Sequence, residues 1–186
     1  MFARTERLLL RPGWREDAGA LFQAIADPMI VRNLATAPWP YSLADAEAFL
    51  MRERPPADAA CLIFLREGGA PQLVGGIGFG PMADRVGVRE FGYWIARPYW
   101  GRGFATEAGR ALLANARDTL RLKRLDAGHF LDNPASGRVL AKLGFKPTGV
   151  TRARYSAGRG AEAECREFAL ELACEEAETD PCAMAA

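Results

Sequence analysis

The sequence is poor in the residues that most often build metal and nucleophile sites. Its 186 residues include one histidine, His129, and four cysteines, at positions 61, 165, 174 and 182. No CxxC spacing occurs, and one histidine cannot complete the usual zinc patterns, so we predict no metal site. Because Cys61, Cys165 and Cys174 have no histidine partner in a sequence motif, a cysteine relay is not expected either. We expect reduced, mostly buried thiols, as in a cytosolic protein.

A strong net charge and long apolar runs are also missing. The 24 basic and 23 acidic residues leave a net charge of +1, which gives no global field to attract nucleic acid or an anionic membrane. Residues 1–7 contain no signal-peptide apolar region, and no stretch approaches a membrane span. We therefore expect a cytoplasmic protein that binds neither nucleic acid nor a membrane.

Length and composition indicate one folded domain. A chain of 186 residues with 49% hydrophobic and 25% charged residues can bury a substantial core. No internal repeat or linker is visible, so we predict a single domain over residues 1–174. The segment 175–186, acidic and then small and polar, is expected to be a disordered tail.

The predicted elements alternate between hairpins and strand–helix–strand crossovers. Apolar periodicity and capping signals predict helices near residues 15–26, after Ser42, after Gly103 and after Asn133. A loose turn is expected over 81–88. The predicted strands cover residues 8–10, 61–66, 73–79, 90–95, 124–130, 148–154 and 164–172. This order predicts an α/β or α+β fold with a mixed sheet of about seven strands and helices on both faces.

A glycine-rich turn between a predicted strand and a predicted helix is the most informative segment. Gly101 and Gly103 leave backbone N–H groups accessible at a helix start, which is a natural seat for phosphate. The segment is not a P-loop, because no Gly-Lys-Ser/Thr follows. It also fails the dinucleotide fingerprint, because Thr106 stands where the third glycine would be.

The same segment carries a resemblance to a known family. Residues 100–105, WGRGFA, resemble the acyl-CoA pyrophosphate loop R/Q-x-x-G-x-G/A of the GNAT acetyltransferase superfamily. Gly103 and Ala105 match that pattern, and Trp100 replaces the first Arg/Gln. This replacement occurs in a branch that resembles ribosomal-protein N-terminal alanine/serine acetyltransferases. Supporting matches in the right order, over about residues 4–172, are TERLxLRP from residue 5, VGGIG from 74, EFGYWI from 90, NxxS from 133 and LxKLGF from 140.

The resemblance implies an acetyl-CoA-dependent N-acetyltransferase that transfers the acetyl group directly to a primary amine. The strand ending at Ile95 would splay from the strand ending at Phe130, leaving backbone groups for pantetheine and an N–H that polarises the thioester carbonyl. Backbone N–H groups of residues 101–106 would hold the CoA pyrophosphate. The residues implied in cofactor binding are Ile95, Ala96, Trp100, Gly101, Arg102, Gly103, Phe104, Ala105, Thr106, Asn133 and Ser136.

Two residues of the predicted helix after 133 have a structural and a functional interpretation. Asn133 can cap this helix ahead of Pro134, and the matching family residue lies against the cofactor. Ser136 can be a polar first-turn residue, or the acid that protonates the departing CoA thiolate. Many family members place a tyrosine for that role where this chain has Leu140, which leaves Ser136 as the candidate acid.

The catalytic base has three candidates: Glu90, His129 and a water molecule. Glu90 is the candidate that we prefer for deprotonating the amine, directly or through water. An α-amine with a pKa near 7.7–8.0 needs less help than a lysine near 10.4, so a weak base suits a protein N-terminus. The acceptor side is predicted to include Trp39, Tyr41 and Tyr93 as substrate-rim residues, Trp39 from a proline-bounded loop.

Three functions therefore stay open at this stage. The acceptor is a protein N-terminal α-amine, or a small amine such as an antibiotic, polyamine or amino acid. Alternatively, the chain is a CoA-binding module without activity, which the leucine at position 140 favours. Families of this kind often form dimers, so a homodimer is among the expected assemblies.

Overall fold

A computed structural model of the chain describes residues 1–82 and 85–172. The predicted tail over 175–186 lies outside the described residues. The strands are β1 (Ala3–Arg4), β2 (Leu8–Arg11), β3 (Ala59–Leu65), β4 (Gln72–Met82), β5 (Arg85–Ile95), β6 (Arg124–Phe130), β7 (Lys146–Ser156) and β8 (Ala161–Glu171). The helices are α1 (Ala18–Ile25), α2 (Pro28–Val31), α3 (Leu43–Met51), α4 (Phe104–Asp118) and α5 (Pro134–Lys142), with 3₁₀ turns at Arg15–Asp17 and Arg97–Tyr99.

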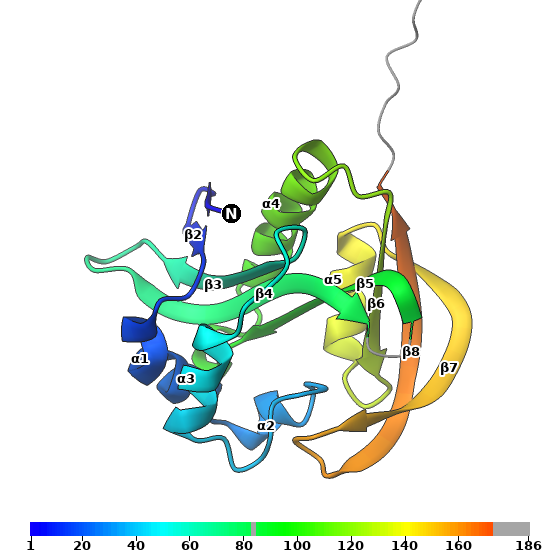
Figure 1. The fold of residues 1–186 in the computed structure, drawn as a ribbon, viewed down its shortest axis with the longest axis horizontal. Coiled ribbons are helices and arrows are strands. Elements are labelled where there is room, and N and C mark those ends of the chain that lie inside the picture. Colours follow the sequence, from blue (N-terminus) through cyan, green and yellow to red (C-terminus); the bar gives the residue numbers. More distant parts are fainter. Residues whose placement is uncertain (83–84, 173–186) are drawn as a thin grey trace, which may run out of the picture.

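These strands form one mixed sheet in the order β1-β2-β3-β4-β5-β6-β8-β7 (Figure 1). Every neighbouring pair is antiparallel except β5 and β6, which run parallel. The mixed α/β fold class is thus confirmed, with eight strands rather than about seven. The additional strand is β1, which has two residues and carries no periodic signal.

The region between β4 and β5 differs from the prediction. A loose turn over 81–88 was expected, but β4 continues to Met82 and β5 already begins at Arg85. Pro81 and several glycines hide the alternating pattern in the sequence, and the register shifts between Pro81 and Met82. As a consequence, Glu90 lies in the middle of a long strand and not at its start.

Helix boundaries follow from local capping. The Asp27 side chain accepts a hydrogen bond from the Met29 N–H at 2.7 Å, and Pro28 occupies the first turn of α2. Ser42 and Asp45 form a reciprocal capping box at the start of α3. Gly144, with φ of +90°, ends α5 in the left-handed conformation that glycine adopts without strain.

Two apolar clusters cover the two faces of the sheet, as predicted. One cluster packs α4 and α5 against residues such as Phe91, Ile95 and Phe168. The other packs α1, α2 and α3 against Leu62 and Phe64. Side chains of β5 alternate between them, since Trp94 packs against the second cluster. No helix of the described chain is long and apolar enough to cross a membrane.

The site is positioned by the way in which β5 and β6 separate. Their register pairs only Glu90 with Asp126 and Phe91 with Ala127. Beyond this contact β5 continues to Ile95 and β6 to Phe130 without pairing to each other, while β6 pairs with β8 along its other edge over its whole length. The carboxyl ends of the two parallel strands therefore part, which confirms the expected splay.

Candidate active site

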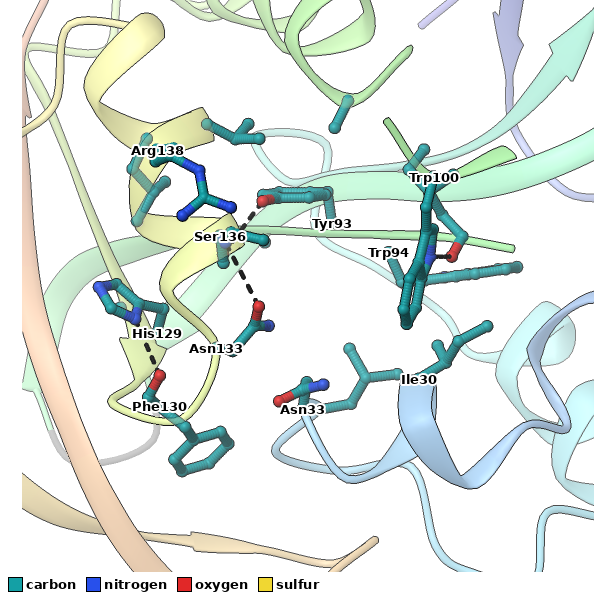
Figure 2. A pocket seen from close by; sticks show the side chains of 18 of the residues that line it. Ile30, Asn33, Tyr93, Trp94, Trp100, His129, Phe130, Asn133, Ser136 and Arg138 are labelled. Carbon is teal, nitrogen blue, oxygen red and sulfur yellow. Dashed lines mark hydrogen bonds between the residues drawn. The ribbon is translucent and has the colours of Figure 1, made fainter. Parts of the chain in front are cut away.

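A cavity of about 490 Å³ lies at the parted strands. Its walls come from β5 and β6, the loop before α4, and the first turns of α4 and α5 (Figure 2). Tyr93, Asn133 and Ser136 lie together in this view, with Trp100 across from them. Of the eleven residues expected to bind the cofactor, the structure brings nine to this cavity: Ile95, Trp100, Gly101, Gly103, Phe104, Ala105, Thr106, Asn133 and Ser136.

The two remaining cofactor candidates do not line the cavity. Ala96 is buried and its N–H donates to the Val74 carbonyl at 2.9 Å, so that group is already used within the sheet. The Arg102 side chain is directed to the ring of Phe104, with its guanidinium carbon 4.9 Å from the ring centroid. Its carbonyl accepts a hydrogen bond from Arg7 at 3.2 Å.

The start of α4 has the geometry of an anion seat. Gly101 and Gly103 have φ of +75° and +81°, and Gly103 is the N-cap of the 15-residue helix. The first bond of the helix runs from the Glu107 N–H to the Gly103 carbonyl at 3.0 Å. The N–H groups of residues 103–106 therefore have no carbonyl partner within the helix and point out of its positive end. A β-carbon at Gly101 would meet nothing within 4 Å, so the space above the turn is open.

Trp100 fixes this turn to the end of β5, a role that the sequence did not indicate. Its indole Nε1–H donates to the Ile95 carbonyl at 2.6 Å. The side chain at the position of the missing Arg/Gln thus ties the loop to the strand. The pattern alone gave no signal for this bond, because the two residues are brought together only by the 3₁₀ turn at Arg97–Tyr99.

Glu107 anchors the other side of the turn through contacts with the N-terminal segment. Its carboxylate accepts hydrogen bonds from Thr5 Oγ1 at 2.6 Å and from the Arg7 N–H at 3.0 Å, and pairs with the Arg7 guanidinium at 2.6 Å. Burial raises the pKa of Glu107, but these bonds outweigh it and hold the pKa below its ordinary value. The N-terminal segment is therefore fastened to α4 directly below the glycines.

At the first turn of α5, Asn133 and Ser136 lie next to Tyr93. The Asn133 side chain caps the helix by accepting a hydrogen bond from the Ser136 N–H at 3.3 Å, as predicted. The Tyr93 hydroxyl donates to Ser136 Oγ at 3.0 Å (Figure 2). Leu140 is only 1% exposed and belongs to the core, where it adds an apolar side chain to the wall of the same cavity.

A second cavity, of about 570 Å³, meets the first one across β5. It extends under α3 and along β3 and β4. Six residues line both cavities: Leu34, Ala35, Glu90, Gly92, Tyr93 and Trp94. The side chain of Glu90 and the open position at Gly92 therefore lie where a ligand in one cavity can reach a ligand in the other.

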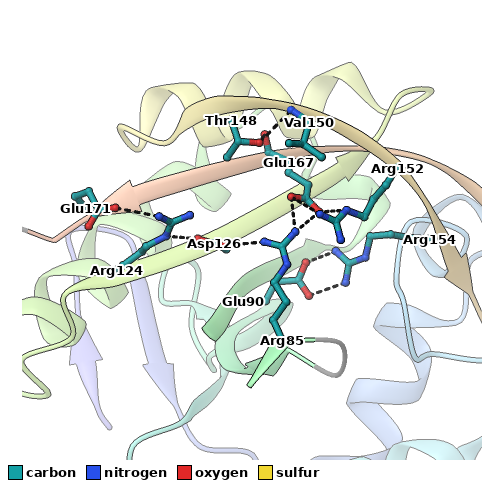
Figure 3. Close-up of polar contacts among 10 residues, drawn as sticks. All are labelled: Arg85, Glu90, Arg124, Asp126, Thr148, Val150, Arg152, Arg154, Glu167 and Glu171. Atoms are coloured by element: carbon teal, nitrogen blue, oxygen red, sulfur yellow. Dashed lines mark hydrogen bonds and ion pairs between the residues drawn. The ribbon is translucent and has the colours of Figure 1, made fainter. Parts of the chain in front are cut away.

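Glu90 is held in place by Arg154 of β7. Arg154 Nη2 donates to Glu90 Oε2 at 2.9 Å, and its Nη1 contacts Oε1. Next to this pair, Arg85 joins the buried carboxylates of Asp126 and Glu167 at 3.1 and 2.7 Å (Figure 3). This network secures the sheet at the point where β5 and β6 still pair.

The other acceptor-side candidates lie in different places. Tyr93 lines both cavities. Tyr41 is only 8% exposed and forms part of the wall of the second cavity, and burial raises its pKa to about 12. It is drawn inward because it packs with the α1–α3 cluster. Trp39 is 44% exposed and lines neither cavity.

His129 lines the first cavity on the α5 side. Its Nδ1 bonds the Phe130 carbonyl at 2.9 Å, and its ring packs on Phe168 at 5.5 Å between centroids. The other ring nitrogen faces Gly137, where a β-carbon would come within 2.6 Å. Both nitrogens are thus turned toward the protein, and His129 does not line the second cavity.

The described cysteines and acidic residues do not suggest a metal centre. Cys61 and Cys165 are free and buried, and burial raises the pKa of both thiols. Over residues 1–82 and 85–172, no group of three or more His, Cys, Asp or Glu side chains is placed to hold a metal ion. Cys174 and Cys182 lie outside this part of the chain.

Comparison with known proteins agrees with this geometry. The family model described as "Acetyltransferase (GNAT) domain" matches residues 7–146. The chain belongs to the GNAT acetyltransferase family, and it is an acetyl-CoA-dependent N-acetyltransferase.

Three relatives illustrate the range of similarity. The uncharacterized N-acetyltransferase YoaA of Bacillus subtilis (strain 168) is 31% identical over 153 residues, which cover 80% of this chain and 84% of YoaA. The ribosomal-protein-serine acetyltransferase of Escherichia coli (strain K12) is 30% identical over 74 residues, 40% of this chain and 41% of that protein. The solved structure of RimL, a ribosomal L7/L12 α-N-protein acetyltransferase in complex with coenzyme A, has a TM-score of 0.73 at 20% identity, covering 92% of this chain and 98% of RimL.

Proposed function

We propose that this acetyltransferase acetylates the N-terminal α-amine of a protein. The observation that carries the proposal is the meeting of two cavities at Glu90, Gly92, Tyr93 and Trp94. One cavity contains the start of α4 with its unpaired N–H groups, and the other does not include that turn. A donor and an acceptor can thus enter from opposite sides of β5 and touch at one point.

Acetyl-CoA would occupy the first cavity. Its pyrophosphate would bind the N–H groups at residues 101–106, where α4 offers unpaired donors and the positive end of its dipole. Pantetheine would run between the parted ends of β5 and β6 toward Asn133 and Ser136. Arg102, which is exposed on the same turn, would add positive charge near the phosphates.

The acceptor amine would arrive through the second cavity and attack the thioester beside Glu90. The amine loses one proton to Glu90 or to a water molecule held by it. An N–H of β5 stabilises the oxyanion of the tetrahedral intermediate. Ser136, on the other side of the strand, protonates the departing thiolate.

An α-amine fits this site better than a lysine side chain. Arg154 forms an ion pair with the Glu90 carboxylate, so the base at the junction is a carboxylate that already binds a cation. An α-amine with a pKa near 7.7–8.0 needs little more than that, whereas a lysine near 10.4 needs a strong base. The names of the relatives point the same way, since one acts on a ribosomal protein and another is an α-N-protein acetyltransferase.

The test is thiol release from acetyl-CoA with a matched panel of acceptors. The panel pairs each peptide in two forms: a free N-terminus with acetylated lysine, and a blocked N-terminus with free lysine. Small amines (an aminoglycoside, a polyamine and free amino acids) complete it. We expect turnover with free N-termini only. Turnover confined to small amines would assign the enzyme to small-molecule acetylation, and acetyl-CoA binding without turnover on any acceptor would contradict the proposal.

Three further expectations from the sequence accompany this proposal. We propose a cytoplasmic location, where ribosomal and other newly made N-termini are available, and no nucleic-acid partner, given the net charge of +1. We also propose a homodimer, which sedimentation equilibrium of the full chain tests directly.

A further inference from the structure

Tyr93 faces the helix that carries the candidate acid. Side chains on β5 alternate, so Phe91, Tyr93 and Ile95 lie on the face covered by α4 and α5. The Tyr93 ring packs at 6.1 Å from Phe91, between centroids. Its hydroxyl ends 3.0 Å from Ser136 Oγ (Figure 2). Residues 43 positions apart in the sequence thus form one hydroxyl pair inside the first cavity.

In the Tyr93–Ser136 pair, Tyr93 is the donor and Ser136 Oγ is the acceptor. Ser136 is fixed on the first turn of α5, because its N–H bonds both the side chain and the carbonyl of Asn133. With Tyr93 donating to Ser136 Oγ, the Ser136 hydroxyl proton is left to point elsewhere. The cavity lies next to it, so the free proton is available to a ligand that reaches this wall.

We propose that Tyr93 is the proton source behind Ser136, in place of the family tyrosine that is leucine here at position 140. The proposal rests on the proposed seat of acetyl-CoA, with its sulfur beside Ser136. Serine alone is a poor acid, since it would be left as an alkoxide. A second hydroxyl that supplies a proton to Ser136 Oγ removes this difficulty.

The proton count of the step balances. The amine nitrogen forms its bond to the carbonyl carbon and loses one proton to the base. Collapse of the tetrahedral intermediate breaks the C–S bond, and its electron pair goes to sulfur. Sulfur takes the Ser136 proton, Ser136 Oγ takes the Tyr93 proton, and the Tyr93 phenolate regains one from solvent. The products are the amide and CoA with a free thiol.

The surroundings keep Tyr93 in its protonated form between turnovers. Burial raises its pKa above the ordinary value, and the bond to Ser136 offsets this only in part. A neutral phenol is therefore available at neutral pH. Because its pKa is raised, Tyr93 gives its proton to Ser136 Oγ only as Ser136 passes its own proton to the developing thiolate, late in the step.

The test uses the fastest acceptor of the panel, peptide or small amine, so it does not depend on the acceptor class. Tyr93→Phe, Ser136→Ala and the double variant are compared with Tyr155→Phe, which removes an exposed phenol on β7. Acetyl-CoA affinity is measured by calorimetry and folding by thermal unfolding. Tyr93→Phe keeps the ring and its packing, which separates the hydroxyl from the fold.

We expect kcat to fall by about 10²-fold in both single variants, with acetyl-CoA affinity within threefold of wild type. The double variant should be no slower than the slower single variant, because both act in one relay. In the wild type, kcat should fall at high pH as the Tyr93 hydroxyl ionises. This fall should be absent in Tyr93→Phe, a change that lost packing would not produce. A normal kcat in Tyr93→Phe beside a slow Ser136→Ala would overturn the relay alone. Normal rates in both single variants would overturn the role of Ser136 as well. Transfer to peptide N-termini by the wild type would still support the proposed function.

Discussion

Arg154 of β7 donates hydrogen bonds to both carboxylate oxygens of Glu90 on β5, 64 residues away in the sequence. The hydrogen bond to Glu90 raises the pKa of Arg154, so the guanidinium stays charged. The side chains are 21% and 25% exposed, so the pair lies at a wall and not in the deep core. Glu90 is therefore a carboxylate held at a fixed place beside Gly92, where the two cavities meet.

Replacing the carboxylate should slow transfer without loss of the donor. We expect Glu90→Gln to lower kcat/KM for the amine by about 10²-fold, because the proton acceptor is lost. Acetyl-CoA affinity should be unchanged. Glu164→Gln, on exposed β8 surface, is the matched control and should retain wild-type rates.

Because Glu90→Gln also breaks the ion pair with Arg154, the free energy of unfolding is measured separately. The double variant Glu90→Gln with Arg154→Gln removes both charges and should recover much of any lost stability. It should not recover activity. Recovery of the rate along with the stability would show that Glu90 acts only through the fold.

Glycine at position 103 should be required for donor binding. Gly103→Val places a branched side chain on the turn and a strained φ at +81°. We expect acetyl-CoA affinity to fall at least tenfold by calorimetry, since the backbone can no longer approach the phosphates. Gly149→Val, at φ +84° in open space on β7, carries the same strain away from the cavities. Equal affinity in both variants would count against the phosphate seat.

Gly92 should be the opening between donor and acceptor. A β-carbon there meets nothing within 4 Å, and the position lines both cavities. Gly92→Val should leave thermal stability unchanged or raised, since valine favours strands. We expect kcat/KM for the acceptor to fall by more than tenfold, with a smaller effect on acetyl-CoA affinity. A stable variant that turns over at the wild-type rate would rule out this passage.

Low pH should weaken the contacts by which Glu107 fastens the N-terminal segment to α4. The folded-state pKa of Glu107 is lowered, so its contribution to stability is present above the unfolded pKa near 4.3 and is lost as pH falls through the folded value. Glu107→Gln should cost about 1 kcal/mol at pH 7 by urea unfolding. The difference from wild type should close on acidification below about pH 4. Glu6→Gln, at an exposed position, should show no such pH dependence.

The sequence was sufficient for features that are local or periodic. The capping pair of Ser42 and Asp45, the Asn133 cap and the strand at 124–130 all follow from neighbouring residues. The glycine turn before α4 was recognisable because Gly101 and Gly103 adopt a positive φ that other residues rarely adopt. These features needed no knowledge of distant contacts.

What the sequence could not supply depends on contacts between distant strands. The Tyr93–Ser136 and Glu90–Arg154 pairs span 43 and 64 residues and exist only once β5, α5 and β7 meet. The burial of Tyr41 depends in the same way on distant contacts, since it comes from packing with the α1–α3 cluster. Strands were predicted over 73–79 and 90–95, but the full length of β4 and β5 was not, because glycine and proline interrupt their alternation.

The most direct test of the account is a crystal structure of the protein with coenzyme A. We predict the diphosphate against the N–H groups of residues 101–106 and the thiol between the ends of β5 and β6, near Ser136. A complex in which the coenzyme lies elsewhere, with that turn blocked by protein atoms, would contradict the central claim.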